Sequence, residues 1–467
     1  MFNKFILLVS LAAFVWLIKR DNRLREGISA ASWIPTLWVG IIASRPLSTW
    51  LGFGGGSDTQ GGSPLDALFF MAMIFASLIV LSRRQVAWSQ LISENRAIFI
   101  FYGFLLVSVI WAYSPFVSFK RWFKELGNIF VLLVILTEAS PQQALRAVFF
   151  RCGCVLMPLS YVFVRWFPEL GRTYNIHSGQ MEVTGVTFQK NSLGAMILVC
   201  SLIILWDWLE LLKLRKEHPQ EKLRLDLYLR FSLLLLGAYL LHICDSKTSM
   251  TCLALGAFVL AATRLPLLRK RLSRLGALAV AGFVGYLVLN QIFDVKGAVL
   301  NDLGRNADLT GRTEVWQALL NAGTDPIIGT GYMDIWDDPR YVSKYPDGDS
   351  ISAHNGYLEI YLCSGAIGVF LLAVMILASG VRINRALAWD GDYGVVRFAI
   401  LLVALLANYT ETNFAWMTPV GFLFLTATIG HAEAASVVRQ IETPIDAAPE
   451  LTEEDIQAGG AAVSNHR

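Results

Sequence analysis

Apolar runs about as long as a membrane-spanning helix recur along most of the chain, and polar segments separate them. A helix needs about 20 mostly apolar residues to cross a hydrocarbon core of about 30 Å. We therefore predict an all-α, polytopic integral membrane protein with about 12–13 transmembrane helices. The predicted spans lie near residues 4–18, 28–43, 65–82, 97–113, 127–138, 147–164, 192–210, 230–245, 250–263, 276–293, 356–378, 397–409 and 416–430.

The composition excludes a soluble protein and gives no sign of a nucleic-acid partner. Hydrophobic residues make up 55% of the 467 residues and charged residues only 16%, whereas soluble domains carry about 25% charged residues. The formal net charge of +3 is not the strongly basic balance of a nucleic-acid-binding domain. The six cysteines lie in or beside apolar runs, and we interpret them as packing residues.

Lysine and arginine cluster in alternate loops, which sets the predicted orientation. Loops with this bias usually face the cytoplasm. Longer segments lie on the opposite, external face, at residues 45–64, 114–126, 165–191 and 294–355. We expect one transmembrane domain over residues 1–432 that includes the large external loop at 294–355. A cytoplasmic, disordered tail rich in small and acidic residues follows over 433–467.

His354 is the first candidate for chemistry. It is one of two histidines on the predicted external face, the other being His177, and it lies where the large loop returns to the membrane. Ser352 is a plausible N-cap, which would put His354 in the first helical turn. The positive end of the helix there keeps the imidazole neutral, as a general base requires. The alternative is a histidine that only hydrogen-bonds at the start of a helix.

External cations form the second candidate site. Arg312 begins a predicted amphipathic helix over about 312–322 that contains Trp316, and a helix N-terminus with an arginine suits a phosphate. The alternative is a lipid-headgroup anchor. Seven further cations lie on the predicted external face or at its boundary, where the orientation rule predicts few, and together they suggest a converging anion site. These cations are Lys120, Arg121, Lys124, Arg172, Lys190, Lys247 and Arg305. For Lys247, an ordinary ion pair with Asp245 is the alternative.

A metal site is the weaker interpretation of the acidic residues in the large loop. Asp347 and Asp349, and an earlier group at 334–338, could hold a divalent ion. They lie among turn-forming residues, where aspartate is common for conformational reasons. We predict neither a metal nor another cofactor.

Four stretches carry a resemblance to a known family. They are Gly171-Arg172 with 185–194, Ser246-Lys247-Thr248, Gly311-Arg312 to Trp316 with Pro326 and 329–332, and Ala353-His354-Asn355 to Glu359 with Gly365 and Gly368. In this order they resemble the O-antigen ligase/polymerase (Wzy/WaaL-like) superfamily of bacterial envelope enzymes, and within it the exopolysaccharide-production (ExoQ-like) branch. The sequence departs from the pattern at Gln189, where histidine is usual, and at Lys247, where arginine is usual.

The resemblance implies a GT-C-like fold in the bacterial inner membrane and a metal-independent, inverting glycosyltransferase. Such enzymes move a glycan from undecaprenyl diphosphate to a hydroxyl acceptor on the periplasmic face. His354 would be the catalytic base. The residues expected to bind the diphosphate are Arg312, Arg172, Lys190, Lys247 and Arg121, and those expected to support the site are Asn355, Glu359, Asn191 and Trp316.

Three function classes stay open at this point. A polysaccharide polymerase would join lipid-linked units, a ligase would move finished chains to lipid A-core or protein, and a flippase or transporter would move the glycan lipid. A transporter needs polar residues at mid-membrane depth, whereas the polar residues here crowd one face, which favours a transferase. The expected partners are the undecaprenyl-diphosphate-linked oligosaccharide, the glycan acceptor, the lipid bilayer and other polysaccharide export proteins.

Overall fold

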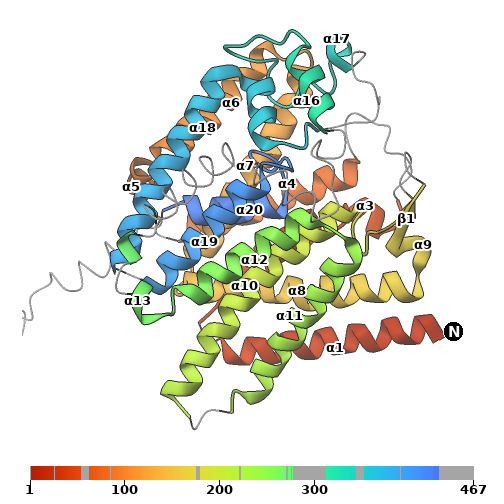
Figure 1. The fold of residues 1–467 in the computed structure, drawn as a ribbon, viewed down its shortest axis with the longest axis vertical. Coiled ribbons are helices and arrows are strands. Elements are labelled where there is room, and N and C mark those ends of the chain that lie inside the picture. The colour runs from red at the N-terminus through yellow and green to blue at the C-terminus, as the bar shows by residue number, and fades with distance from the viewer. Residues whose placement is uncertain are drawn as a thin grey trace, which may run out of the picture.

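In its described part, the computed structural model is a bundle of helices with one small hairpin (Figure 1). The structure describes residues 2–25, 27–53, 63–84, 86–174, 179–219, 222–269, 272–274, 276, 312–342, 352–389 and 391–430. The predicted span at 276–293, the tail at 433–467, and Asp347 and Asp349 lie outside these residues, apart from residue 276.

The described elements follow the apolar runs of the sequence. The first half holds α1 (Phe2–Leu24), η1 (Ala30–Ser32), α2 (Trp33–Ile42), α3 (Leu47–Trp50), α4 (Pro64–Arg83), α5 (Trp88–Glu94), α6 (Arg96–Ser108), η2 (Val109–Trp111), α7 (Pro115–Leu136), α8 (Pro141–Trp166), α9 (Pro168–Gly171), β1 (Arg172–Tyr174) and β2 (Met181–Val183). The second half holds α10 (Lys190–Glu217), α11 (Arg224–Cys244), α12 (Lys247–Ala262), α13 (Pro266–Arg269), η3 (Leu272–Arg274), α16 (Arg312–Leu320), α17 (Pro339–Val342), α18 (Gly356–Trp389), α19 (Gly391–Ala407) and α20 (Pro419–Thr428).

The all-α, polytopic membrane class is confirmed. Five described helices are long and apolar enough to cross a membrane, namely α4, α8, α10, α11 and α18. A sixth span results if α5 and the helix over 96–111, bent by 86° relative to each other, are counted together. Shorter apolar helices lie at Ala30–Ile42, Lys247–Ala262 and Pro419–Thr428. The total of 12–13 spans stays a prediction, because several helices are short and the run at 276–293 is outside the description.

The centre of the bundle is formed by α8 and α10. Helix α10 packs against α8, α11 and α12, while α19 packs against α12, α18 and α20. By contrast, α4 leaves apolar side chains such as Leu68 and Phe75 largely exposed, as expected of a helix face that contacts lipid. The predicted helix in the large loop is confirmed as α16, which lies beside α18 in Figure 1 and packs against its beginning.

A buried ring of four charges fastens α1 to the centre. Arg230 lies 2.7 Å from Asp21 and 2.6 Å from Asp207, and Arg25 lies 2.8 Å from Asp21 and 2.7 Å from Asp207. Each carboxylate therefore faces two guanidinium groups, and all four side chains are buried. Removing one member would leave an uncompensated buried charge.

We expect Asp207→Asn to lower the free energy of unfolding by about 3–5 kcal/mol, because two buried arginines lose a negative partner. Thermal unfolding of the purified protein in detergent measures this loss. The control is Asp392→Asn, which removes a half-exposed partner of Lys213 and should cost about 0–1 kcal/mol. Equal melting temperatures for the two variants would contradict a stabilising role of the ring.

Candidate active site

His354 lies just before α18, outside its first turn. The side-chain oxygen of Asn355 accepts hydrogen bonds from the backbone N–H groups of Tyr357 (3.0 Å) and Leu358 (3.1 Å), so Asn355 is the N-cap. The predicted cap, Ser352, instead accepts from the N–H of His354 at 3.1 Å. The predictions that Ser352 caps the helix and that His354 lies in its first turn are therefore wrong. Asparagine also caps well, and it stands one residue before the helix begins.

The backbone of His354 is held in a left-handed conformation, with φ of 47°. Such strain costs a non-glycine residue about 1–3 kcal/mol and persists only where neighbours enforce it. Glu359 accepts from the N–H of Ala353 at 2.8 Å and from the indole of Trp336 at 2.5 Å. The indole of Trp316 donates to the carbonyl of Ala353 at 2.8 Å. Glu359 and Trp316 thus fix the residue before His354, and neither forms a hydrogen bond with the imidazole in the described structure.

The imidazole of His354 meets a carboxylate from another part of the chain. Its Nδ1 lies 3.4 Å from an oxygen of Glu411, in the segment between α19 and α20. The other oxygen of Glu411 accepts from the side-chain amide of Asn191, in the first turn of α10, at 2.9 Å. His354 and Glu411 stay accessible, with side chains 40% and 24% exposed. Asn191, Glu411 and His354 therefore form a connected set, which we call the histidine relay.

The sequence analysis missed Glu411. It lies in a short polar segment, Thr410-Glu411-Thr412-Asn413, between two predicted spans. The carbonyl oxygen of Glu411 and that of Asn408 both accept from the N–H of Gly356, at 3.1 and 2.8 Å. This places the segment against the start of α18. The polar cluster between two apolar runs could have marked this segment as a candidate, but nothing in the sequence indicated that Glu411 contacts His354.

The histidine relay lines a cavity of about 330 Å³. Polar side chains of the wall are Ser44, Gln189, Asn191, Ser192, Thr248, Ser249, Ser352, His354, Glu411, Thr412, Asn413 and Thr418. The described lining contains no lysine or arginine. Hydroxyl, amide and carboxylate groups of this kind suit the hydrogen-bonding groups of a sugar. We call this space the histidine cavity.

Four of the cations predicted to bind the diphosphate form ion pairs or hydrogen bonds with nearby protein groups. Lys190 lies 2.8 Å from Glu182, and Lys247 lies 2.7 Å from Asp245, which is the ordinary ion pair considered for it. Arg172 donates to the carbonyl of Val164 at 2.9 and 3.1 Å.

Arg121 pairs with Asp337 and donates to the carbonyl of Met333 at 2.6 Å. Like Arg172, Lys190 and Lys247, it does not line the histidine cavity. The predicted convergence of these four residues on one anion site is not observed at the histidine cavity, because each charge lies beside its own protein partner. Arg312 begins α16 as predicted, and its side chain lies outside the description.

The segment at 325–331 of the large loop packs against a break in α18. Gly365 interrupts the helix with φ of 61°. The N–H groups of Thr330 and Gly331 donate to the carbonyls of Leu362 and Cys363, both at 2.9 Å. Gly329 is required here, because a Cβ on it would lie 2.4 Å from the backbone nitrogen of Ser364. The Gly-x-Gly motif therefore permits close contact between backbones.

The acidic residues of this loop also bind protein groups. Asp334 accepts from the N–H groups of Tyr113 (2.6 Å) and Ser114 (2.9 Å), and Asp338 binds Arg340. Burial raises the pKa of Asp334, although the two backbone bonds act in the opposite direction. Asp334 thus holds the loop against the segment between η2 and α7, whereas Asp338 binds within the loop.

We expect Gly329→Ala to cost about 1–3 kcal/mol of stability through steric overlap, in addition to left-handed strain. Gly323→Ala is the matched control, because Gly323 also has positive φ (81°) but no atom lies within 4 Å of an added Cβ. Thermal unfolding of both variants separates overlap from strain. Equal melting temperatures of the two variants would contradict the close contact between Gly329 and α18.

Two comparisons with known proteins bear on the function of this candidate site. A family model described as O-antigen ligase matches residues 231–373, which include His354 and the first part of α18. The exopolysaccharide production protein ExoQ of Rhizobium meliloti (strain 1021) is 24% identical over 345 residues, covering 71% of this chain and 76% of that protein. The matches support an enzyme of the O-antigen ligase/polymerase type in a multi-pass membrane protein. They confirm the resemblance predicted from the sequence, to the O-antigen ligase/polymerase superfamily and, within it, to exopolysaccharide production proteins.

Proposed function

We propose that this protein is a bacterial inner-membrane glycosyltransferase that polymerises a cell-envelope polysaccharide. It transfers a glycan from undecaprenyl diphosphate to a sugar hydroxyl of a lipid-linked acceptor, on the periplasmic face and with inversion. The observation that carries the proposal is the histidine relay at the wall of a polar, sugar-sized cavity. The similarity to an exopolysaccharide production protein favours a polymerase.

His354 is proposed as the general base, with Nε2 as the accepting atom. A carboxylate only accepts hydrogen bonds, so contact with Glu411 favours the hydrogen on Nδ1 and leaves the Nε2 lone pair free. The acceptor hydroxyl loses its proton to Nε2 as its oxygen bonds to the anomeric carbon. The bond from that carbon to the diphosphate oxygen breaks on the opposite face, which inverts the configuration. Glu411 then stabilises the imidazolium that has formed.

A ligase is the second candidate, because the matching family model is described as O-antigen ligase. Both reactions use the same base and the same leaving group, and they differ only in the acceptor. The remaining class, a flippase or transporter, has no use for a base at the wall of a sugar-sized cavity. The two transferase reactions are separated by their products.

The test is turnover by the full chain, purified and reconstituted in liposomes with the lipid-linked oligosaccharide of its own host. Separation of the products by size should show a ladder of repeat units on one lipid. A single added chain, formed only when lipid A-core or a protein acceptor is supplied, would replace the polymerase with the ligase. If neither product forms and the intact lipid is transported instead, both the polymerase and the ligase function would be contradicted.

We expect the same reaction to proceed in EDTA, because the leaving diphosphate can be stabilised by fixed cations. The measurement is the rate of undecaprenyl diphosphate release with and without chelator. Loss of turnover that magnesium or manganese restores would contradict metal independence.

A further inference from the structure

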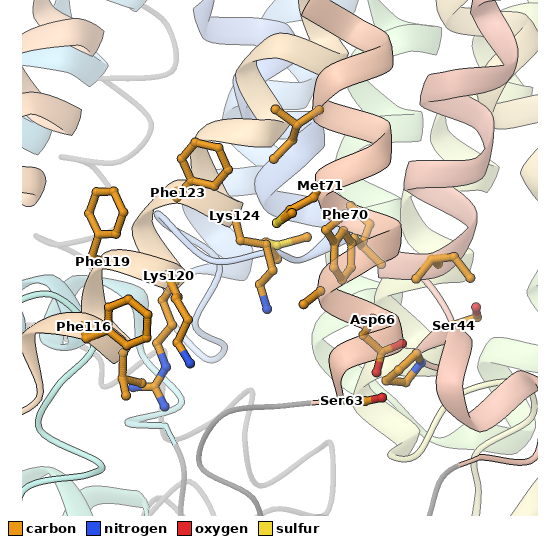
Figure 2. A pocket seen from close by; sticks show the side chains of 18 residues that line it. Ser44, Ser63, Asp66, Phe70, Met71, Phe116, Phe119, Lys120, Phe123 and Lys124 are labelled. Atoms are coloured by element: carbon orange, nitrogen blue, oxygen red, sulfur yellow. The ribbon is translucent and has the colours of Figure 1, made fainter.

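A second cavity, of about 680 Å³, lies between α2, α4 and α7. We call it the lysine pocket, and Figure 2 shows it from close by. Its volume falls in the range of about 300–1,000 Å³ that is usual for ligand sites. It adjoins the histidine cavity, because Ile42, Ser44 and Met417 line both.

The wall of the lysine pocket is largely apolar and includes four phenylalanines. Phe70 and Met71 come from α4, and Phe116, Phe119 and Phe123 come from α7. Phe116 is 73% exposed and Phe119 is 43% exposed, so this side opens outward. An apolar wall that opens outward from a membrane-embedded bundle suits a hydrocarbon chain entering from the bilayer.

Cations lie within this apolar surface. Lys120 and Lys124 are one turn apart on α7, and their side chains are labelled in the pocket of Figure 2. Lys120 Nζ lies 5.1 Å from the ring centre of Phe116, and Lys124 Nζ lies 5.4 Å from that of Phe70.

Neither lysine has an ion pair within the described part of the chain, whereas neighbouring Arg121 binds Asp337. The carboxylate in the described wall, Asp66, accepts from the N–H (2.9 Å) and hydroxyl (2.6 Å) of Ser48. Like charges spaced four residues apart on a helix repel each other. An anion bound between the two lysines would relieve this repulsion, and unpaired charges in such a setting commonly mark a functional site.

We propose that the lysine pocket binds the diphosphate and first isoprene units of the lipid-linked glycan donor. Lys120 and Lys124 contact phosphate oxygens, and the phenylalanines pack against the isoprenoid. The anomeric carbon, which is bonded directly to the diphosphate, then lies at the shared wall formed by Ile42, Ser44 and Met417, where it meets the acceptor hydroxyl that His354 deprotonates. This inference rests on the proposed function, and it supplies positive charge for the leaving group that the described lining of the histidine cavity does not contain.

The experiment measures binding of undecaprenyl diphosphate, without glycan, to the full chain in phosphatidylcholine nanodiscs. We expect Lys120→Gln/Lys124→Gln to weaken binding at least tenfold, while binding of undecaprenol, which has no phosphate, changes less than twofold. Arg340→Gln is the control, because Arg340 is an exposed cation held by Asp338 outside the pocket. Thermal unfolding of the double variant confirms that it is folded.

The outcomes separate this inference from the proposed function. Wild-type affinity in a folded double variant would overturn the lysine pocket, and glycan transfer by the same protein would leave the function standing. Lysine-dependent binding without glycan transfer by the wild-type chain would support the pocket and contradict the function. Equal competition by phosphatidylglycerol would overturn the donor assignment, since the pocket would then accept any anionic headgroup.

Discussion

Cells that carry His354→Asn are expected to lose the polysaccharide while the protein accumulates normally. General-base assistance contributes about 10²–10⁴-fold to a rate, and a sugar hydroxyl is a poor nucleophile until its proton is removed. Asparagine is the better substitution, because it tolerates the left-handed backbone at this position more readily than alanine does. The loss is therefore attributable to the imidazole rather than to strain. The measurement is polymer yield at equal membrane protein level.

The comparison variant is His177→Asn, which changes the other histidine on the predicted external face. We expect its polymer yield to stay within twofold of the wild type. Wild-type yield from His354→Asn at equal protein level would remove the base from the mechanism and leave His354 as a structural residue.

The second large effect is expected from Glu411→Gln. The glutamine keeps the size of the side chain and an oxygen for the amide of Asn191, but it removes the charge that faces Nδ1 of His354. The charge is needed most when the imidazolium forms, so kcat should fall at least tenfold, about 1.4 kcal/mol, with KM nearly unchanged. Steady-state kinetics in liposomes give both constants.

Glu169→Gln is the matched control for this effect, because Glu169 is an exposed glutamate of α9 in the predicted external segment 165–191. It should keep both constants. A rise in KM with unchanged kcat in Glu411→Gln would instead show that Glu411 serves binding and not the proton transfer.

Much of the helical framework was predictable because hydropathy determines it locally. The apolar run at 65–82 became α4, Pro64–Arg83, whose N-cap Ser63 and first-turn Pro64 are ordinary start signals. The amphipathic pattern beginning at Arg312 became α16. His354 was identified by its place between the loop and a span, and by resemblance.

The remaining parts of the site depend on contacts that no local pattern specifies. Glu411 is 220 positions from Asn191 and 57 from His354, so only the packing of α10, α18 and α19 brings them together. Lys190 was expected to bind the diphosphate, but the hairpin of β1 and β2 places Glu182 beside it. Lys120 and Lys124 were visible in the sequence as external cations. The cavity that they line forms only when α4 packs against α7.

The most direct test of the central claim is a single-turnover measurement with purified His354→Asn and the lipid-linked glycan in excess of its dissociation constant. The claim is that His354 is the base for glycan transfer from undecaprenyl diphosphate. It predicts that the rate constant for diphosphate release falls at least 100-fold, while binding of undecaprenyl diphosphate stays within twofold of the wild type. A variant that releases the diphosphate and extends the glycan at the wild-type rate would contradict the claim.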